Sequence, residues 1–149
     1  SPVLFDAEYE FVVGKAATLR QGEDVALLAC GIMVAEALEA ARTLAEKGIR
    51  AQVLNVSTIK PLDTEAVVAA ARKTGAVVTC EEHSIIGGLG GAVAETLAEQ
   101  CPVPLERVGV RDQFGQSGKP SELLAEYGLT AQHIVAAAER VLARKGKRA

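Results

Sequence analysis

Aromatic residues are scarce in this chain of 149 residues, which has three phenylalanines, two tyrosines and no tryptophan. Proteins that bind single-stranded nucleic acid stack bases on exposed aromatic rings, and this composition offers few rings for that purpose. An excess of positive charge is also lacking, because 16 lysines and arginines face 19 aspartates and glutamates, for a net charge of −3. We therefore expect no nucleic-acid partner and no electrostatic attachment to a membrane.

Long apolar runs and cysteine pairs are lacking as well. No apolar run approaches the roughly 18 residues that a membrane-spanning helix needs, and no signal peptide opens the chain. The three cysteines, Cys30, Cys80 and Cys101, form no Cys-x-x-Cys pair, which indicates buried thiols rather than disulfides or metal ligands. These absences predict a cytoplasmic protein. Because the sequence opens with Ser-Pro and no initiator methionine, we expect it to be a piece of a longer chain.

The chain is rich instead in alanine, valine and leucine, a composition that suits helices packed on a sheet. Its length is typical of one domain and allows roughly 70% of the unfolded surface to be buried. Four apolar runs predict strands, the first three as the near-continuous buried runs of a parallel sheet. These predicted strands cover 25–30, 51–56, 76–80 and 105–110.

Helical periodicity fills the intervals between the predicted strands. A first helix is expected within 31–48, and its buried face would carry Val34, Leu38, Ala41 and Ala45. The opposite positions are mostly glutamates, as on a helix that packs on a sheet with one side and meets water with the other.

The remaining helices are marked by signals at their ends. Asp63 or Thr64 can cap a second helix, which Gly75 closes. A third helix is expected from about 88 to 99, and Thr130 can cap the last one.

The alternation of strands and helices predicts an α/β protein with a doubly wound sheet and right-handed crossovers. The segment 14–22 predicts one more strand at the edge of this sheet, and 121–127 predicts a short helical turn. Ligands of such sheets bind in the crevice at the carboxyl ends of the strands. Any functional site is therefore expected at that end.

The segment EEHSIIGGLGG, residues 81–91, follows the third predicted strand and leads into a helix at that end of the sheet. Three roles suit its residues: acid–base chemistry, phosphate binding by helix amides, or a tight structural turn. The candidate residues for an interface or a ligand loop are Glu81, Glu82, His83, Gly87, Gly88, Gly90 and Gly91.

The spacing favours the structural turn. Glu81 and Glu82 are neighbours, so in an extended segment their side chains point to opposite faces and cannot act as a pair. Neither Gly-x-Gly-x-x-Gly nor Gly-x-x-x-x-Gly-Lys-Ser/Thr is present, and no second histidine lies near His83 to complete a metal site. We predict no catalytic, cofactor-binding or metal-binding residue in this chain, with a nucleotide- or phosphate-binding module as the alternative.

Several segments resemble a known family. The segments KPLD (60–63) and VVTCEEHSIIGGLGGAVAETL (77–97) are similar to the C-terminal domain shared by transketolases, deoxyxylulose-phosphate synthases and the beta chains of 2-oxo-acid dehydrogenases. The segment DQFGQSGKPSELLAEYGLT (112–130) resembles transketolase in particular, and FVVGKAATLRQG (11–22) fits the entry into this domain. Together these segments extend over nearly the whole chain.

The resemblance implies a Rossmann-like domain of three layers, with a mostly parallel five-stranded sheet and one antiparallel edge strand. The intact enzyme would transfer a two-carbon ketol unit between sugar phosphates. It would use thiamine diphosphate and a divalent metal, which are held by its other two domains, so that this domain binds no cofactor and is inactive alone.

The implied partners are the other domains or a subunit of the same enzyme, in a homodimer to which the glycine-rich loop contributes. The resemblance leaves two alternatives open. One is the same domain of a synthase or of a dehydrogenase beta chain, and the other is a regulatory ligand site at the strand ends.

Overall fold

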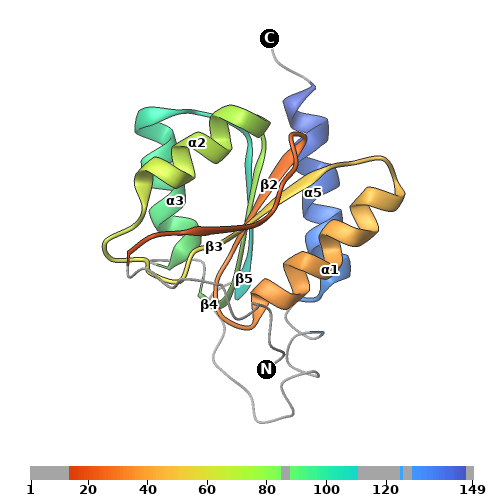
Figure 1. The fold of residues 1–149 in the computed structure, drawn as a ribbon, viewed down its shortest axis with the longest axis horizontal. Coiled ribbons are helices and arrows are strands. Elements are labelled where there is room, and N and C mark those ends of the chain that lie inside the picture. Colours follow the sequence, from red (N-terminus) through yellow and green to blue (C-terminus); the bar gives the residue numbers. More distant parts are fainter. Residues whose placement is uncertain (1–13, 85–87, 111–124, 126–128, 147–149) are drawn as a thin grey trace.

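The computed structural model describes residues 14–84, 88–110, 125 and 129–146, which form a layered α/β structure (Figure 1). Its strands are β1 (Ala17–Arg20), β2 (Val25–Ala29), β3 (Ala51–Asn55), β4 (Val77–Ser84) and β5 (Leu105–Val110). The helices within these ranges are α1 (Met33–Glu46), α2 (Thr64–Thr74), α3 (Leu89–Gln100) and α5 (Ala131–Lys145). The predicted alternation of strands and helices is therefore confirmed.

The strands form a single sheet in the order β1-β3-β2-β4-β5. β2 pairs in parallel with β3 and with β4, and β4 pairs in parallel with β5. β1 lies at one edge and runs antiparallel to β3. The mostly parallel sheet and its antiparallel edge strand are confirmed.

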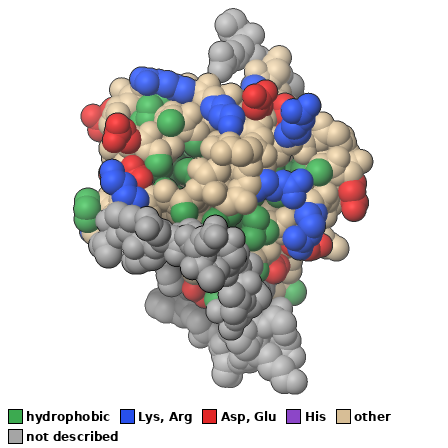
Figure 2. All heavy atoms as spheres, in the orientation of Figure 1, with side chains coloured by type: hydrophobic (Ala, Val, Ile, Leu, Met, Phe, Trp, Pro, Cys, Tyr) green, Lys and Arg blue, Asp and Glu red, His purple; other side chains and the backbone are tan. Residues whose placement is uncertain are grey.

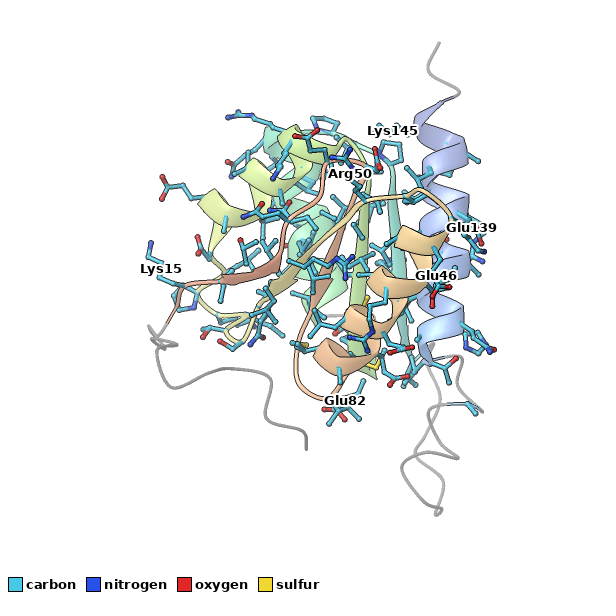
Figure 3. The ribbon with its side chains drawn as sticks, turned by 45° about the vertical axis from the view of Figure 1, so that its right-hand side comes forward. Lys15, Glu46, Arg50, Glu82, Glu139 and Lys145 are labelled. Carbon is cyan, nitrogen blue, oxygen red and sulfur yellow. The ribbon has the colours of Figure 1, made fainter. Side chains whose placement is uncertain are left out.

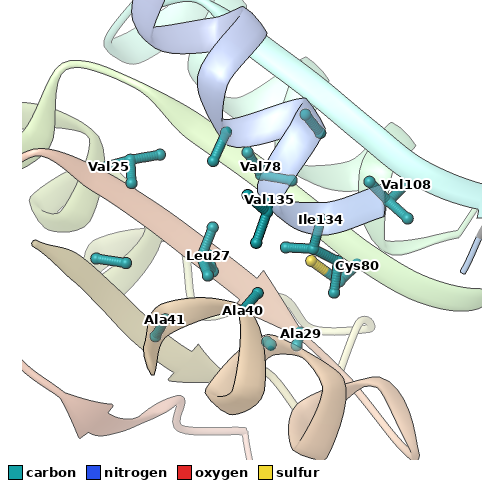
Figure 4. Packing of buried hydrophobic residues seen from close by; sticks show 14 of the residues in the cluster. Val25, Leu27, Ala29, Ala40, Ala41, Val78, Cys80, Val108, Ile134 and Val135 are labelled. Carbon is teal, nitrogen blue, oxygen red and sulfur yellow. The ribbon is translucent and has the colours of Figure 1, made fainter. Parts of the chain in front are cut away.

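Two helical layers cover the sheet, with α2 and α3 on one side and α1 and α5 on the other (Figure 1). Alternation along β2 supplies both cores, because Leu27 and Ala29 pack toward α1 and α5, whereas Ala26 and Leu28 pack toward α2 and α3. Figure 4 shows the first of these clusters. Within the described ranges the buried core contains no aromatic ring, so close packing depends on small aliphatic side chains.

The helix ends largely follow the predicted signals. Asp63 caps α2, where its Oδ1 accepts a hydrogen bond from the amide of Ala66 at 3.2 Å. Gly75 closes the same helix in the left-handed conformation, with φ of 70°. Thr130 is the N-cap residue of α5, but its hydroxyl makes no capping bond and lies instead 2.6 Å from Nδ1 of His133.

Two details differ from the expectations. The helix α1 leaves Ala45 exposed, because its buried stripe turns toward both the sheet and α5. This stripe consists of Met33, Val34, Ala37, Ala40, Ala41 and Leu44. The strand β4 continues past Cys80 to Ser84, so the acidic pair and the histidine belong to a strand rather than to the turn after it.

The helical turn expected over 121–127 lies outside the described residues, apart from Ala125, which is helical. In the part of the chain that the structure describes, no helix is long and apolar enough to cross a membrane.

Candidate functional site

The carboxyl ends of β2 and β4 form the topological switch point of the sheet. These two strands are neighbours, yet the chain leaves β2 toward α1 on one face and leaves β4 toward α3 on the other. Ligands of open α/β sheets bind at such a point. Cys30 and Gly31 follow β2 there, and Glu81 and Glu82 lie in the last part of β4. The structure therefore brings the predicted acidic residues to the place where this fold class binds ligands.

Glu81 is fully buried and bonded to the start of α3. Its Oε1 accepts a hydrogen bond from the amide of Leu89 at 2.8 Å, and its Oε2 accepts one from the amide of Gly90 at 2.6 Å. The N-cap residue, Gly88, has no side chain to bond these amides, and the first turn of α3 contains no acidic residue. The carboxylate from β4 thus satisfies amides that every helix leaves free at its beginning, where negative charge is favoured.

Gly90 is the glycine whose small size this contact requires. A Cβ atom at this position would lie 3.1 Å from Oε2 of Glu81 and 3.0 Å from Cδ of Arg107. Both distances are tighter than ordinary van der Waals contact, so a side chain at position 90 would displace the carboxylate or the arginine. The glycine-rich pattern therefore serves a close approach between α3, β4 and β5.

Glu82 points to the opposite side of the sheet. Its Oε1 lies 2.9 Å from the position that a Cβ of Gly31 would take, and Gly31 has a φ of 60°. Figure 3 places Glu82 beside the beginning of α1. The two neighbouring carboxylates therefore lie on opposite faces of the sheet, and they do not form an acid–base pair, as the alternation along a strand predicts.

The thiols at the switch point are poorly suited to nucleophilic chemistry. The amide of Cys30 donates to the carbonyl oxygen of Cys80 at 3.2 Å, which links the ends of β2 and β4. Burial, reinforced by the carboxylates of Glu81 and Glu82, raises the pKa of the Cys30 thiol from 9.0 to about 11. Burial together with Cys30 and Glu81 also raises the pKa of Cys80. Both groups stay protonated near neutral pH, and only a thiolate is a good nucleophile.

The other candidates are less well defined. The backbone of His83 lies in β4, but its side chain and the whole of Gly87 lie outside the described residues. Gly88 and Gly91 lie at the beginning of α3, where Gly91 is half-buried. Within the described ranges, no three histidine, cysteine or acidic side chains come together in a group that could hold a metal ion.

The structure also contains surface hollows that the sequence did not indicate. A groove of about 660 Å³ lies between α1 and α5, and it is bridged by Lys47 and Glu139, whose charged atoms are 3.3 Å apart. A hollow of about 590 Å³ lies along α2, beside Lys15 and Arg72. On the face shown in Figure 2, basic and acidic side chains are interspersed, and no large surface of one charge is seen. Neither hollow meets the acidic residues of β4.

Comparison with known proteins gives the family. The model of the family "Transketolase, C-terminal domain" matches residues 14–134. This chain belongs to the transketolase C-terminal domain family. The resemblance predicted from the sequence motifs, and the fold that it implied, are confirmed.

Individual relatives are longer than this chain. It is 61% identical over 147 residues to the 6-deoxy-6-sulfo-D-fructose transketolase subunit SqwH of Clostridium sp. (strain MSTE9), a match that covers 98% of this chain and 46% of the subunit. It is 48% identical over 139 residues to 1-deoxy-D-xylulose-5-phosphate synthase 1 of Geobacter sulfurreducens (strain ATCC 51573 / DSM 12127 / PCA), covering 92% of this chain and 22% of the synthase.

A solved structure is similar over nearly the whole chain. It is a split-gene transketolase, described as an inactive beta4 tetramer, with a TM-score of 0.92 and 51% identity. The match covers 97% of this chain and 47% of that one. The chain thus spans less than half the length of these relatives.

Proposed function

We propose that this transketolase C-terminal domain is part of an enzyme that transfers a two-carbon ketol unit between sugars carrying an anionic group. The proposal rests on the 61% identity, over almost the whole chain, to a subunit of a 6-deoxy-6-sulfo-D-fructose transketolase. By this relationship the donor would be a ketose with a phosphate or a sulfonate at its far end. The domain itself would contribute to the fold and the assembly of the enzyme.

The described residues support a role without chemistry of their own. Glu81 is buried with both oxygens bonded to backbone amides, so it is not open to a substrate proton. Cys30 carries a thiol whose pKa is raised to about 11, which keeps it in the unreactive protonated form.

Enzymes of the transketolase and deoxyxylulose-phosphate synthase families depend on thiamine diphosphate, and the donor set described above does not fit that cofactor. A diphosphate with its divalent metal needs oxygen ligands for the ion and free amides or cations for the phosphates. In the described ranges no group of acidic, cysteine or histidine side chains is suited to the ion, and two amides at the start of α3, those of Leu89 and Gly90, are already bonded to Glu81. We propose that the cofactor and its metal are held by other domains, and we assign no catalytic step to this one.

The assembly we propose is a homodimer of the longer chain, in the cytoplasm, without nucleic-acid or membrane partners. A split-gene relative forms a tetramer of its beta chains that is described as inactive. By analogy, if the enzyme containing this domain is split, the chain that contains it would be inactive until it meets the diphosphate-binding partner.

The test is an activity assay of the longer protein, with its partner chain where one exists. We expect thiamine-diphosphate-dependent ketol transfer from xylulose 5-phosphate or 6-deoxy-6-sulfofructose to an aldose phosphate. Condensation of pyruvate with glyceraldehyde phosphate, in the absence of ketol transfer, would instead assign the chain to the synthase. Ketol transfer by the present 149 residues alone would contradict the structural role.

A further inference from the structure

The beginning of α3 has the arrangement by which α/β proteins bind the anionic groups of their ligands. It follows a parallel strand at the switch point, it is rich in glycine, and its first amides point toward the strand ends. In this protein a carboxylate of the chain itself already lies there. The amides of Leu89 and Gly90 donate to the two oxygens of Glu81 at 2.8 and 2.6 Å.

We propose that Glu81 is a built-in anionic ligand. Its carboxylate occupies the position that an external phosphate or carboxylate would otherwise take, and it thereby excludes such ligands and fixes the beginning of α3 on β4. This inference holds whichever reaction the longer enzyme catalyses.

The burial of Glu81 supports a specific role for its charge. A carboxylate without any exposed surface is strongly disfavoured unless hydrogen bonds replace the lost water. Two charge-assisted bonds to amides, at a helix end that favours negative charge, provide that replacement. A side chain that only filled space at position 81 would need neither the charge nor the two bonds.

The neighbouring residues are adapted to the same carboxylate. Gly90 has no side chain, and a Cβ there would crowd Oε2 of Glu81 at 3.1 Å. The alkyl part of Arg107 lies close to the same position, with Cδ 3.0 Å from where the Cβ would be. Gly88, the N-cap residue, makes no side-chain bond that would compete with Glu81.

A second helix of this protein provides an internal comparison. The amide of Ala131, at the beginning of α5, donates at 3.0 Å to Oε1 of Glu36, which comes from α1. Glu36 is also a remote carboxylate at a helix start, but it is half-buried and accepts one such bond instead of two. Water can replace its carboxylate after removal, whereas removal of Glu81 leaves the amides of two buried residues without their acceptor.

The experiment removes each carboxylate and supplies a free one. We expect the melting temperature of Glu81→Ala to be lower than that of the wild type and to rise with the logarithm of the formate concentration, as for a ligand that binds only the folded state. Formamide, which is planar and of similar size but neutral, is expected to have no such effect. The wild type and Glu36→Ala should respond to formate no more than to sodium chloride at the same ionic strength.

The proposal is overturned if formate raises the melting temperature of all three proteins equally, or if formamide acts as well as formate. If Glu81→Ala does not fold, Glu81→Gln provides a second test, because it keeps the volume but replaces one acceptor oxygen by a donor group. Hydrogen exchange at the amides of Leu89 and Gly90 should then be faster than in the wild type by about tenfold or more. Unchanged exchange at both amides would overturn the proposal as well.

Discussion

Lys145, in the last turn of α5, donates from its ammonium group to the carbonyl oxygen of Thr74 at 2.5 Å, and so joins the ends of α5 and α2. The same ammonium group donates to the carbonyl oxygen of Asp24 at 3.2 Å. Gly75 makes room for the side chain, since a Cβ there would lie 3.3 Å from its Cε. One lysine thus connects the two helical layers at the amino end of the sheet, where Figure 3 shows it.

Replacing Lys145 by methionine is expected to destabilise the protein by about 1–3 kcal/mol, because the carbonyl of Thr74 loses a charged donor in a partly buried place. Methionine keeps the alkyl chain, so the change reports the ammonium group rather than the packing. The matched control is Lys47→Met, which removes an exposed ion pair with Glu139 and should cost less than about 1 kcal/mol. Urea unfolding of the two variants measures both values, and equal losses would contradict the role of Lys145.

Replacing two buried threonines by valine is expected to change the free energy of unfolding in opposite directions. Thr79 lies in β4 with no exposed surface, and its hydroxyl has no hydrogen-bond partner among the described residues. The hydroxyl of Thr74 donates to the carbonyl of Ala70 at 2.8 Å and lies 3.0 Å from that of Ala76. Thr79→Val is therefore expected to raise the free energy of unfolding by up to about 1 kcal/mol, whereas Thr74→Val should lower it by about 1–2 kcal/mol.

Each valine variant replaces one hydroxyl group by a methyl group, so each variant is a control for the other. Their melting temperatures should lie on opposite sides of the wild-type value. A loss of stability in Thr79→Val comparable to that in Thr74→Val would show that the hydroxyl of Thr79 has a partner.

A loss of stability at high pH is expected from Cys30. Its thiol has a pKa of about 11 in the folded protein, against an ordinary value of 9.0. Below pH 9 the thiol is protonated in both the folded and the unfolded protein, so its contribution to the free energy of unfolding is fully present. Between pH 9 and 11 the unfolded state releases the proton first, and the free energy of unfolding falls as the pH rises.

The measurement is urea unfolding at about pH 8 and about pH 10.5. Cys30→Ala should show a smaller loss between these pH values than the wild type, by up to about 2 kcal/mol. Thr74→Val is the control, because it destabilises the protein without removing a group that titrates between these pH values. Identical pH dependences of Cys30→Ala and the wild type would contradict the prediction.

Local residue patterns predicted the alternation of strands and helices, and the family resemblance implied the antiparallel edge strand, but neither predicted the contacts at the helix ends. The cap of α2 was predictable because Asp63 lies next to the helix that it caps. Glu81 lies eight residues before the amide of Leu89, and Glu36 lies 95 residues before that of Ala131. Such caps depend on which strands and helices become neighbours, and no sequence spacing encodes them. The sequence offered only indirect evidence of a remote cap: α3 begins after a glycine and has no acidic residue in its first turn, so its free amides need an acceptor from elsewhere.

The extent of β4 was underestimated for a related reason. Because the residues after Cys80 are polar, the sequence predicted that the buried strand ends at Cys80. In the structure, pairing with β5 resumes between Ser84 and Val110 after an irregularity. A charged residue such as Glu81 predicts the end of a buried strand unless its hydrogen-bond partners are known. The parallel core was predictable because buried apolar runs that alternate with helices pair through right-handed crossovers. The order β1-β3-β2-β4-β5 was not predicted, because no local pattern tells which strands become neighbours.

The last prediction concerns the interface assigned to the beginning of α3. Gly91 is half-buried in the first turn of this helix, next to the glycine that approaches Glu81 and Arg107. If another copy of the longer chain packs on this turn, a large side chain at position 91 separates the two surfaces, because glycine allows the closest backbone approach. We expect Gly91→Leu to weaken the homodimer of the longer enzyme, seen as a concentration-dependent shift to monomer in analytical ultracentrifugation. Ala98→Leu, at an exposed position near the other end of α3, is the control and should leave the dimer intact. If Gly91→Leu sediments as the wild type at all concentrations, the start of α3 is not part of the interface.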